Sequence, residues 1–325
     1  MKILRNAALA AGVAVVGAAG VAHAEYPTKP VTVVVPYGPG GAADLAARII
    51  GNEAPEYLGG TVLVVNQAGA AGVTGSTMVA KGPKDGHQVL MSRVGSQATV
   101  PAMNETIPYT WDEFTMLGIV ELNPFAIAVA ADSPYQTFDD LAKALKGGEK
   151  LTYSSAGVGT LLHMASMIVI DDLGVDSEAH IHVPFKGGGN ATAAVISGNA
   201  DFIFHNLSGL KGGIDSGQLR ALVVTTPDRV AAIPDTPTAT EVGHPNLNAV
   251  IGWSGVWGPK DMNPEAVDAW VSTLASLKED ESWNTATSDL GSIPTVMSPE
   301  DTRVFVEQQF NTFRTIADKL GMVVR

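Results

Sequence analysis

Short apolar runs recur along the chain, and each is followed by a glycine- or serine-rich turn and then by a stretch of helical periodicity. Apolar runs of this length, without polar alternation, are typical of strands buried within a parallel sheet. The pattern therefore predicts a series of βα units and an α/β fold. The clearest strands are expected at residues 31–36, 62–65, 89–92, 151–154, 181–184 and 202–204.

Helix signals support this pattern. Thr137 and Asp140 have the spacing of a capping box, in which a hydroxyl and a carboxylate satisfy free backbone N–H groups at a helix start. Ser298 offers an N-cap, and Pro299 suits the first helical position. Apolar side chains then recur at helical spacing, which predicts a C-terminal amphipathic helix packed on a core. These residues are Val306, Phe310, Phe313, Ala317 and Leu320.

The N-terminal residues have the layout of a secretory signal peptide. Lys2 and Arg5 precede an apolar run at 7–21, and small residues end the segment at Ala24. We expect residues 1–24 to be removed on export. The run is shorter than the roughly 20 residues that span a membrane, so the mature chain is expected to be soluble. Because the chain has no cysteine, it lacks the attachment point of a lipid-anchored export signal.

Composition removes several function classes. The absence of cysteine from the sequence excludes disulfides, thiolate nucleophiles and cysteine-ligated zinc. The formal net charge is -13 and no basic block is present, so neither nucleic acid nor an anionic membrane surface is an expected partner. Such acidity also repels an acidic ligand, which must then be held by local hydrogen-bond donors.

Three glycine-rich turns follow predicted strands, at residues 38–44, 154–160 and 185–190. In open parallel sheets, ligands bind at the carboxyl ends of strands, where the next helix presents free backbone N–H groups. Adjacent glycines let the backbone approach a ligand closely, and a helix start favours an anion. One such turn alone is as consistent with a tight bend that binds nothing, and Asp44 fits a helix cap better than a contact with an acid. Together, the three turns indicate an anion site.

Motifs for nucleotide binding, metal binding and catalysis are missing from the sequence. The turn at 38–44 lacks the third glycine of a dinucleotide fingerprint, and no glycine turn has the Gly-Lys-Ser/Thr ending of a phosphate loop. The residues around Ser254 lack the spacing of a hydrolase nucleophile elbow. His180 and His182 would share a strand face, but no third ligand stands at a convincing spacing. We therefore expect no cofactor, no metal and no catalytic residue.

The order of the motifs resembles that of the tripartite tricarboxylate transporter receptors, the TctC or Bug family. Residues 26–30 and 36–44 carry the opening of this resemblance, which extends over nearly the whole mature chain. Each block alone is weak evidence for the family. So many blocks in the family's order are specific evidence for it. The further blocks are 81–86, 155–160, 182–187, 200–202 with Asn206, 217–222 and 233–238.

The resemblance implies a two-lobed periplasmic binding protein of the type II-like class, in which each lobe is a central β-sheet flanked by helices and crossing strands form the hinge. Residues 25–122 and 251–325 would form the first lobe, and residues 123–250 the second. The implied function is that a monomer in the periplasm captures a small organic acid, with dicarboxylates among the candidates. The receptor would then deliver the acid to the small and large membrane subunits of a transporter. A receptor that presents its closed form to a sensor would have the same fold, so signalling stays an alternative.

Members of the family bind carboxylates largely through backbone groups and bridging waters in these turns. Carried over to this sequence, the implied contacts are Tyr37, Gly40, Gly41 and Ala42 in the first lobe, and Ser155, Gly159, Thr160, Phe185 and Asn206 in the second.

Two residues depart from the family's usual pattern. Arg93 follows the third strand, where its guanidinium would bind a second carboxylate or form an ordinary salt bridge on the surface or between the lobes. His205, beside Asn206 at a strand end, is either a ligand donor or a packed histidine. Trp253 and Trp257 either wall the cleft or fill the core. The sequence leaves each of these pairs of alternatives open.

Overall fold

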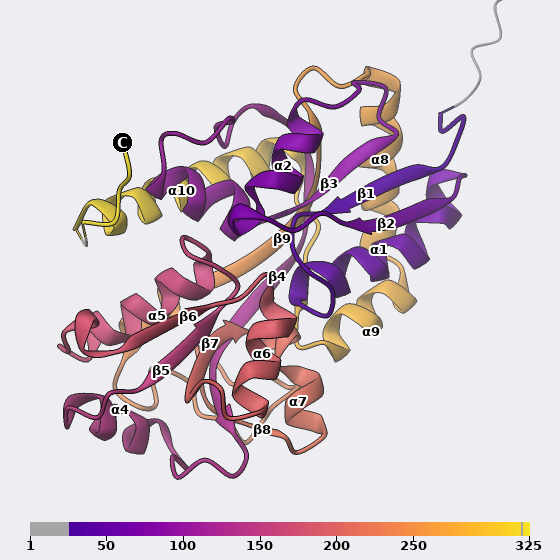
Figure 1. The fold of residues 1–325 in the computed structure, drawn as a ribbon. Helices are drawn as coiled ribbons and strands as arrows, with labels where there is room; N and C mark the ends of the chain where they lie inside the picture. The colour runs from indigo at the N-terminus through magenta and orange to yellow at the C-terminus, as the bar shows by residue number, and fades with distance from the viewer. Residues whose placement is uncertain (1–25, 320) are drawn as a thin grey trace, which may run out of the picture.

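Two β-sheets, one in each lobe, share a single long strand (Figure 1). The computed structural model describes residues 26–319 and 321–325, so the expected signal peptide at 1–24 and Leu320 lie outside it. The strand order is β2-β1-β3-β9-β4 in the first lobe and β6-β5-β7-β4-β8 in the second, and the short β10 also pairs with β4. The strands are β1 (Val31–Val35), β2 (Val62–Asn66), β3 (Gln88–Arg93), β4 (Phe114–Ala130), β5 (Thr152–Ser155), β6 (Ile181–Pro184), β7 (Phe202–Asn206), β8 (Leu219–Val224), β9 (Ile251–Pro259) and β10 (Ile293–Pro294).

Each sheet combines parallel and antiparallel pairs. β1 is parallel to its neighbours β2 and β3, and β5 is parallel to β6 and β7. β9 joins β3 to β4 with antiparallel pairing, and β4 is antiparallel to β7 and β8 in the second lobe. The carboxyl ends of β1, β3, β5 and β7 all open onto the space between the lobes, which places the loops that follow them opposite one another.

Strand β4 runs from one lobe into the other. It pairs with β9 from Phe114 to Pro124, and with β7 and β8 from Phe125 to Ala130. The chain returns to the first lobe at Ile251, where β9 begins. These two crossings connect the lobes in the way expected of a hinge. The lobe boundaries expected from the sequence lie beside the crossings and stay a prediction.

Helices cover both sheets (Figure 1). In the first lobe, α1 and α8 bury one face of the sheet around the fully buried Trp270, and a second core runs from the other face through the crossing strands into the second lobe. In residues 26–319 and 321–325, no helix is long and apolar enough to cross a membrane. The helices are α1 (Ala42–Leu58), α2 (Val73–Ala80), α3 (Val100–Met103), α4 (Phe138–Lys146), α5 (Leu161–Asp172), α6 (Gly188–Ile196), α7 (Lys211–Asp215), α8 (Pro264–Lys278), α9 (Glu281–Asp289) and α10 (Pro299–Lys319).

The six strands predicted from apolar runs are confirmed, with ends that shift by at most two residues. Both predicted helix starts are confirmed as well. The Thr137 hydroxyl accepts the N–H of Asp140, whose carboxylate accepts the N–H of Thr137 in return. Ser298 accepts the N–H of Asp301 at the start of α10. Local hydrogen bonds that depend on a few neighbouring residues were therefore predictable.

Aromatic side chains outside the cavity fill the core. In α10, Phe313 is buried, and the half-buried Phe310 stacks on Trp111 with ring centroids 5.8 Å apart. Trp253 and Trp257 are fully buried with their ring centroids 5.7 Å apart. Of the two alternatives for this tryptophan pair, the structure shows core packing.

Two features of the sheets differ from the sequence prediction. The edge strands are not buried on both faces, because helices do not cover the whole sheet edge: Leu63 and Val65 in β2 and Ile181 in β6 are each more than two-fifths exposed. The long β4 has no uninterrupted apolar pattern, since Glu121 and Asn123 lie within it. Both polar residues are buried at the crossing. From the sequence alone, a segment that contains Glu and Asn would be interpreted as facing solvent.

Phe125 provides a test of packing at the crossing. It is fully buried and meets Phe204 edge to face, with ring centroids 5.5 Å apart. Phe125→Ala should lower the free energy of unfolding by about 3–5 kcal/mol, because the close-packed surroundings cannot refill the space. The control Val304→Ala, at a half-exposed position of α10, should change it by less than about 0.5 kcal/mol. Urea denaturation measures both; equal effects would show that the crossing is loosely packed.

Candidate functional site

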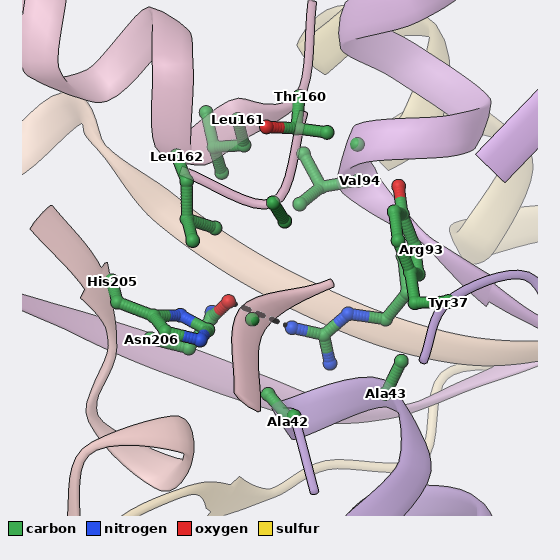
Figure 2. A pocket seen from close by; sticks show the side chains of 14 residues that line it. Tyr37, Ala42, Ala43, Arg93, Val94, Thr160, Leu161, Leu162, His205 and Asn206 are labelled. Carbon is green, nitrogen blue, oxygen red and sulfur yellow. Dashed lines mark hydrogen bonds between the residues drawn. The ribbon is translucent and has the colours of Figure 1, made fainter. Parts of the chain in front are cut away.

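A cavity lies between the two lobes (Figure 2). Its free space, part of it open to solvent, is about 400 Å³. Its walls come from the loops after β1, β3 and β5, from the end of β7, and from the starts of α1, α5 and α6. This position follows the general rule that ligands of open α/β sheets bind beyond the carboxyl ends of strands. The lining residues are Tyr37, Gly41, Ala42, Ala43, Arg93, Val94, Gly95, Ala156, Thr160, Leu161, Leu162, Gly188, His205 and Asn206.

Three helix N-termini face this cavity. α1 begins after Gly41, α5 after Thr160 and α6 after Gly187, and no side chain of the described residues caps any of the three. The Thr160 hydroxyl instead donates to the carbonyl of Gly157 at 2.8 Å. The N–H groups in the first turn of a helix have no partner within that helix. At each helix start, they carry about half a positive elementary charge. The arrangement can therefore bind an anion from three sides.

The turn between β1 and α1 is shaped by Gly40 and held by Asp44. Gly40 has a φ of 76°, in the left-handed region that glycine adopts without strain. The Asp44 carboxylate accepts the Gly40 N–H at 3.0 Å, two N–H groups of Arg48 at 2.9 and 3.0 Å, and the Asn66 amide at 2.8 Å. Burial raises the pKa of Asp44, but these hydrogen bonds outweigh burial and hold the pKa below its ordinary value. Asp44 is thus not the helix cap that the sequence suggested, since it lies in the first turn of α1 and accepts the N–H of Gly40, which precedes the N-cap Gly41. It holds the turn before the helix, and its charge is paired with Arg48.

The turn after β5 is supported by two stacked histidines. The Ser155 hydroxyl lies 2.6 Å from Nε2 of His182, and the Gly159 N–H donates to Nδ1 of His163 at 3.3 Å. The two imidazole rings stack with centroids 4.1 Å apart. Burial lowers the pKa of each histidine to about 4, so both are neutral at pH 7. The pair holds the turn in place without adding charge to the site.

Arg93 links three strands at the lobe junction. Its Nη1 donates to Glu121 of β4 at 3.1 Å and to the Ser254 hydroxyl of β9. Its Nη2 donates to Oδ1 of Asn206, in the second lobe, at 2.9 Å (Figure 2). These three bonds use three of the five N–H groups of a guanidinium and leave two for a ligand. The salt bridge of Arg93 is therefore buried within the first lobe, whereas the hypothesis placed it on the surface or between the lobes; the interlobe contact is the hydrogen bond to Asn206. Arg93 also lines the cavity, and its contact with a ligand stays a prediction.

His205 and Asn206 present unpaired polar atoms in the second-lobe wall. Within the described part of the chain, both ring nitrogens of His205 and Nδ2 of Asn206 have no hydrogen-bond partner, although both residues are only 2% exposed. Burial, and less strongly the charge of Arg93, lower the pKa of His205 to about 3. A Cβ atom at Gly188 or Gly209 would lie 2.3 or 2.5 Å from its Nε2, so glycine is needed at both positions. Unpaired buried polar atoms cost about 1–3 kcal/mol each, which favours a polar ligand at this wall.

The lobes touch each other around the cavity. The Gly38 N–H donates to the carbonyl of Lys186 at 3.2 Å across the cleft. A Cβ atom at Gly41 would lie 3.2 Å from the backbone nitrogen of Gly189, so the missing side chain permits this approach. The structure therefore shows the two lobes closed on the cavity.

Of the eleven residues expected to contact a ligand, seven line the cavity and four do not. Gly40 is hydrogen-bonded to Asp44, and Ser155 to His182. Gly159 and Phe185 line a neighbouring space. Direct contact of any of the eleven with a ligand stays a prediction. The seven are Tyr37, Gly41, Ala42, Arg93, Thr160, His205 and Asn206.

Three lining residues in the first turns of α1 and α5 were not predicted from the sequence. Ala43, Leu161 and Leu162 line the cavity, and their apolar side chains carry no chemical signal. Their place one to three residues after a glycine or threonine N-cap was the available signal, because the backbone there has free N–H groups. Among residues 26–319 and 321–325, no three histidine or carboxylate side chains form a metal cluster, and Nε2 of His182 is taken by Ser155.

Replacing His205 with phenylalanine should make folding less sensitive to acid. The folded-state pKa of about 3 lies below the ordinary histidine value. Above about pH 6.5 the ring is neutral in both the folded and the unfolded chain, so folding carries no protonation cost. As the pH falls below about 6.5, the unfolded chain takes up a proton that the folded chain does not, and the free energy of unfolding falls. Between pH 7 and pH 5, the wild type should lose about 2 kcal/mol more unfolding free energy than His205→Phe. Urea denaturation at the two pH values measures this difference, and equal losses would contradict the burial of a neutral ring.

The comparisons with known proteins agree with this geometry. The model of the tripartite tricarboxylate transporter family receptor, TctC, matches residues 46–322. The structure of the periplasmic binding protein BugD is similar, with a TM-score of 0.87 and 29% identity, and the match covers 92% of this chain and 100% of that one.

Two structures from Rhodopseudomonas palustris are similar as well. MatC with bound malate has a TM-score of 0.84 and 25% identity over 90% of this chain and 100% of that one. An R. palustris protein with adipate has a TM-score of 0.86 and 26% identity over 91% and 99%. The family resemblance of the sequence and the two-lobed α/β fold are thereby confirmed. Since the family model spans most of the sequence, the chain belongs to the tripartite tricarboxylate transporter family of receptors.

Proposed function

We propose that the protein is a periplasmic solute receptor that captures a small carboxylate between its two lobes. The convergence of three uncapped helix N-termini on one closed cavity carries this proposal. Helix N-termini bind anions through backbone N–H groups and the helix dipole. The net charge of -13 makes such local donors necessary, because the field of the whole protein repels an anion.

The solved relatives support the same class of ligand. Malate is bound to MatC and adipate to the second R. palustris protein, and both ligands are dicarboxylates. In this chain the first-turn N–H groups would hold one carboxylate. The two remaining N–H groups of Arg93, the neutral ring of His205 and the amide of Asn206 would serve further polar groups of the acid.

Binding would act through closure of the lobes. A ligand that touches both lobes only when they are closed stabilises the closed form by its binding energy. The small and large membrane subunits of a tripartite transporter would read that form and accept the ligand from a monomeric receptor. Residues 1–24 would direct the chain to the periplasm as a cleaved signal peptide.

No chemistry on the ligand is part of this proposal. The Ser155 hydroxyl lies 2.6 Å from Nε2 of His182, which is the spacing of a nucleophile and its base. However, Ser155 is fully buried and does not line the cavity, and its hydroxyl also donates to the carbonyl of Gly157 at 3.1 Å. The pair is therefore placed to hold the turn, away from any substrate.

A valine at position 41 tests the pocket and its closure. The side chain of Gly41→Val would meet the backbone of Gly188 and Gly189, which lies 3.2 to 3.4 Å from the Cβ position, so the lobes cannot close. Calorimetric titration with mono-, di- and tricarboxylates should give binding to the wild type and at least about 100-fold weaker binding to the variant.

The matched control for this variant is Gly212→Val, where a Cβ atom meets nothing of the described chain within 4 Å. It should bind the same acid with unchanged affinity, and all three proteins should keep similar thermal stability without ligand. Undiminished binding to Gly41→Val, or a wild type that binds no carboxylate, would contradict the proposed function.

Arg93 is the residue expected to distinguish dicarboxylates. Because Glu121 would be left buried without its partner, the measurement compares Arg93→Ala/Glu121→Gln with Glu121→Gln alone. Removing the guanidinium should weaken a dicarboxylate by about 1.5–3 kcal/mol, the value of a hydrogen bond to a charged group, and leave a monocarboxylate nearly unchanged. Calorimetry on both proteins decides this; equal losses for the two ligand classes would reduce Arg93 to a structural salt bridge.

A further inference from the structure

A second space adjoins the cavity. We call it the chamber; its free space, part of it open to solvent, is about 1130 Å³, against about 400 Å³ for the cavity. Tyr37 and Ala156 line both spaces, so the spaces are neighbours on either side of these residues. The Tyr37 hydroxyl donates to the carbonyl of Ala71 at 3.2 Å, and burial raises its pKa to about 12, which keeps it a neutral donor. The chamber is bounded by residues 69–73 and 100–107 of the first lobe, by 156–159 and 185–186 of the second, and by Met322 and Val324.

The chamber wall is mainly apolar. Among the described residues that line it, the titratable side chains are Tyr37 and Lys186, and none is a carboxylate. Two large apolar side chains of the wall are exposed to water, Val158 at 63% and Val324 at 55%. Covering such side chains is favourable in water, so the wall suits an apolar group better than a second charged one.

The wall at residues 69–73 is kept open by an unusual turn. Ala70 and Ala71 have φ values of 45° and 55°, between Gly69 at 152° and Gly72 at 96°. Residues other than glycine are strained in the left-handed region. The turn bends sharply with two methyl groups as its only side chains at these positions, so space remains beside Tyr37 where larger residues would fill it.

We propose that the chamber holds the apolar part, or tail, of an extended organic acid whose carboxylate occupies the cavity. This inference rests on the proposed function and names its ligand class, an alkyl or aromatic acid. The tail passes Tyr37 and Ala156, which line both spaces. Because both lobes line the chamber, the tail gains all its contacts only when the lobes close. A longer tail therefore stabilises the closed form more.

The test is a series of straight-chain acids from butanoate to octanoate, titrated calorimetrically into the mature protein. Each methylene that enters the chamber should tighten binding about fourfold, so octanoate should bind roughly 200-fold more tightly than butanoate. Ile107→Trp fills part of the chamber from a partly buried position and should lower the ratio of octanoate affinity to butanoate affinity at least about tenfold.

A pair of matched variants tests the same idea at the rim. Val158→Ser should weaken octanoate binding about three- to tenfold. Val304→Ser changes a valine outside the chamber that is 52% exposed, against 63% for Val158, and should change the affinity less than about twofold. Thermal unfolding without ligand checks that each variant is folded.

If butanoate binds and the affinity stays constant from butanoate to octanoate, the proposal that the chamber holds the tail is wrong. The proposed function would still stand. Equal effects of the two valine variants would likewise overturn the proposal that the chamber holds the tail. Failure of every mono- and dicarboxylate to bind would overturn the proposed function and this inference together.

Discussion

Three helix starts that face one another across a closed cleft are the constraint on which the site depends. Their partial positive charges repel one another, so an anion bound between them would stabilise the closed form. The chain has 33 acidic residues, yet the acid in the first turn of α1, Asp44, does not line the cavity and is bound by Arg48 and Gly40. The negative partner of the helix starts is thus left for a ligand to supply.

The lobe junction connects this site to the fold. Glu121 and Arg93 form a buried ion pair between β4 and β3, and the same guanidinium reaches Asn206 in the other lobe. A buried ion pair contributes little net stability, but breaking it leaves a buried charge and is costly. The Arg93–Glu121 pair therefore fixes the position of Arg93, which lines the cavity, relative to the crossing strand β4. Closure brings Asn206 and His205 to the cavity wall with their remaining polar atoms unpaired within the described chain.

The sequence predicted the features that depend on local patterns. Continuous apolar runs identified six strands, and the three glycine turns were correctly placed at their carboxyl ends, since both signals lie within a few residues. It did not predict β4, because Glu121 and Asn123 are buried by partners distant in the sequence. Leu161 and Leu162 line the site through their position after an N-cap. Contacts such as Ser155 with His182 arise only when β5 and β6 pair, so no local pattern could reveal them.

The most direct measurement is a crystal structure of the protein with a tightly bound acid. The account predicts a closed cleft in which carboxylate oxygens lie about 3 Å from first-turn N–H groups of α1 and α5, on either side of the lobe boundary. An acid held outside the cavity, or inside it but beyond hydrogen-bond reach of these helix starts, would contradict the claim that the helix N-termini form the anion site.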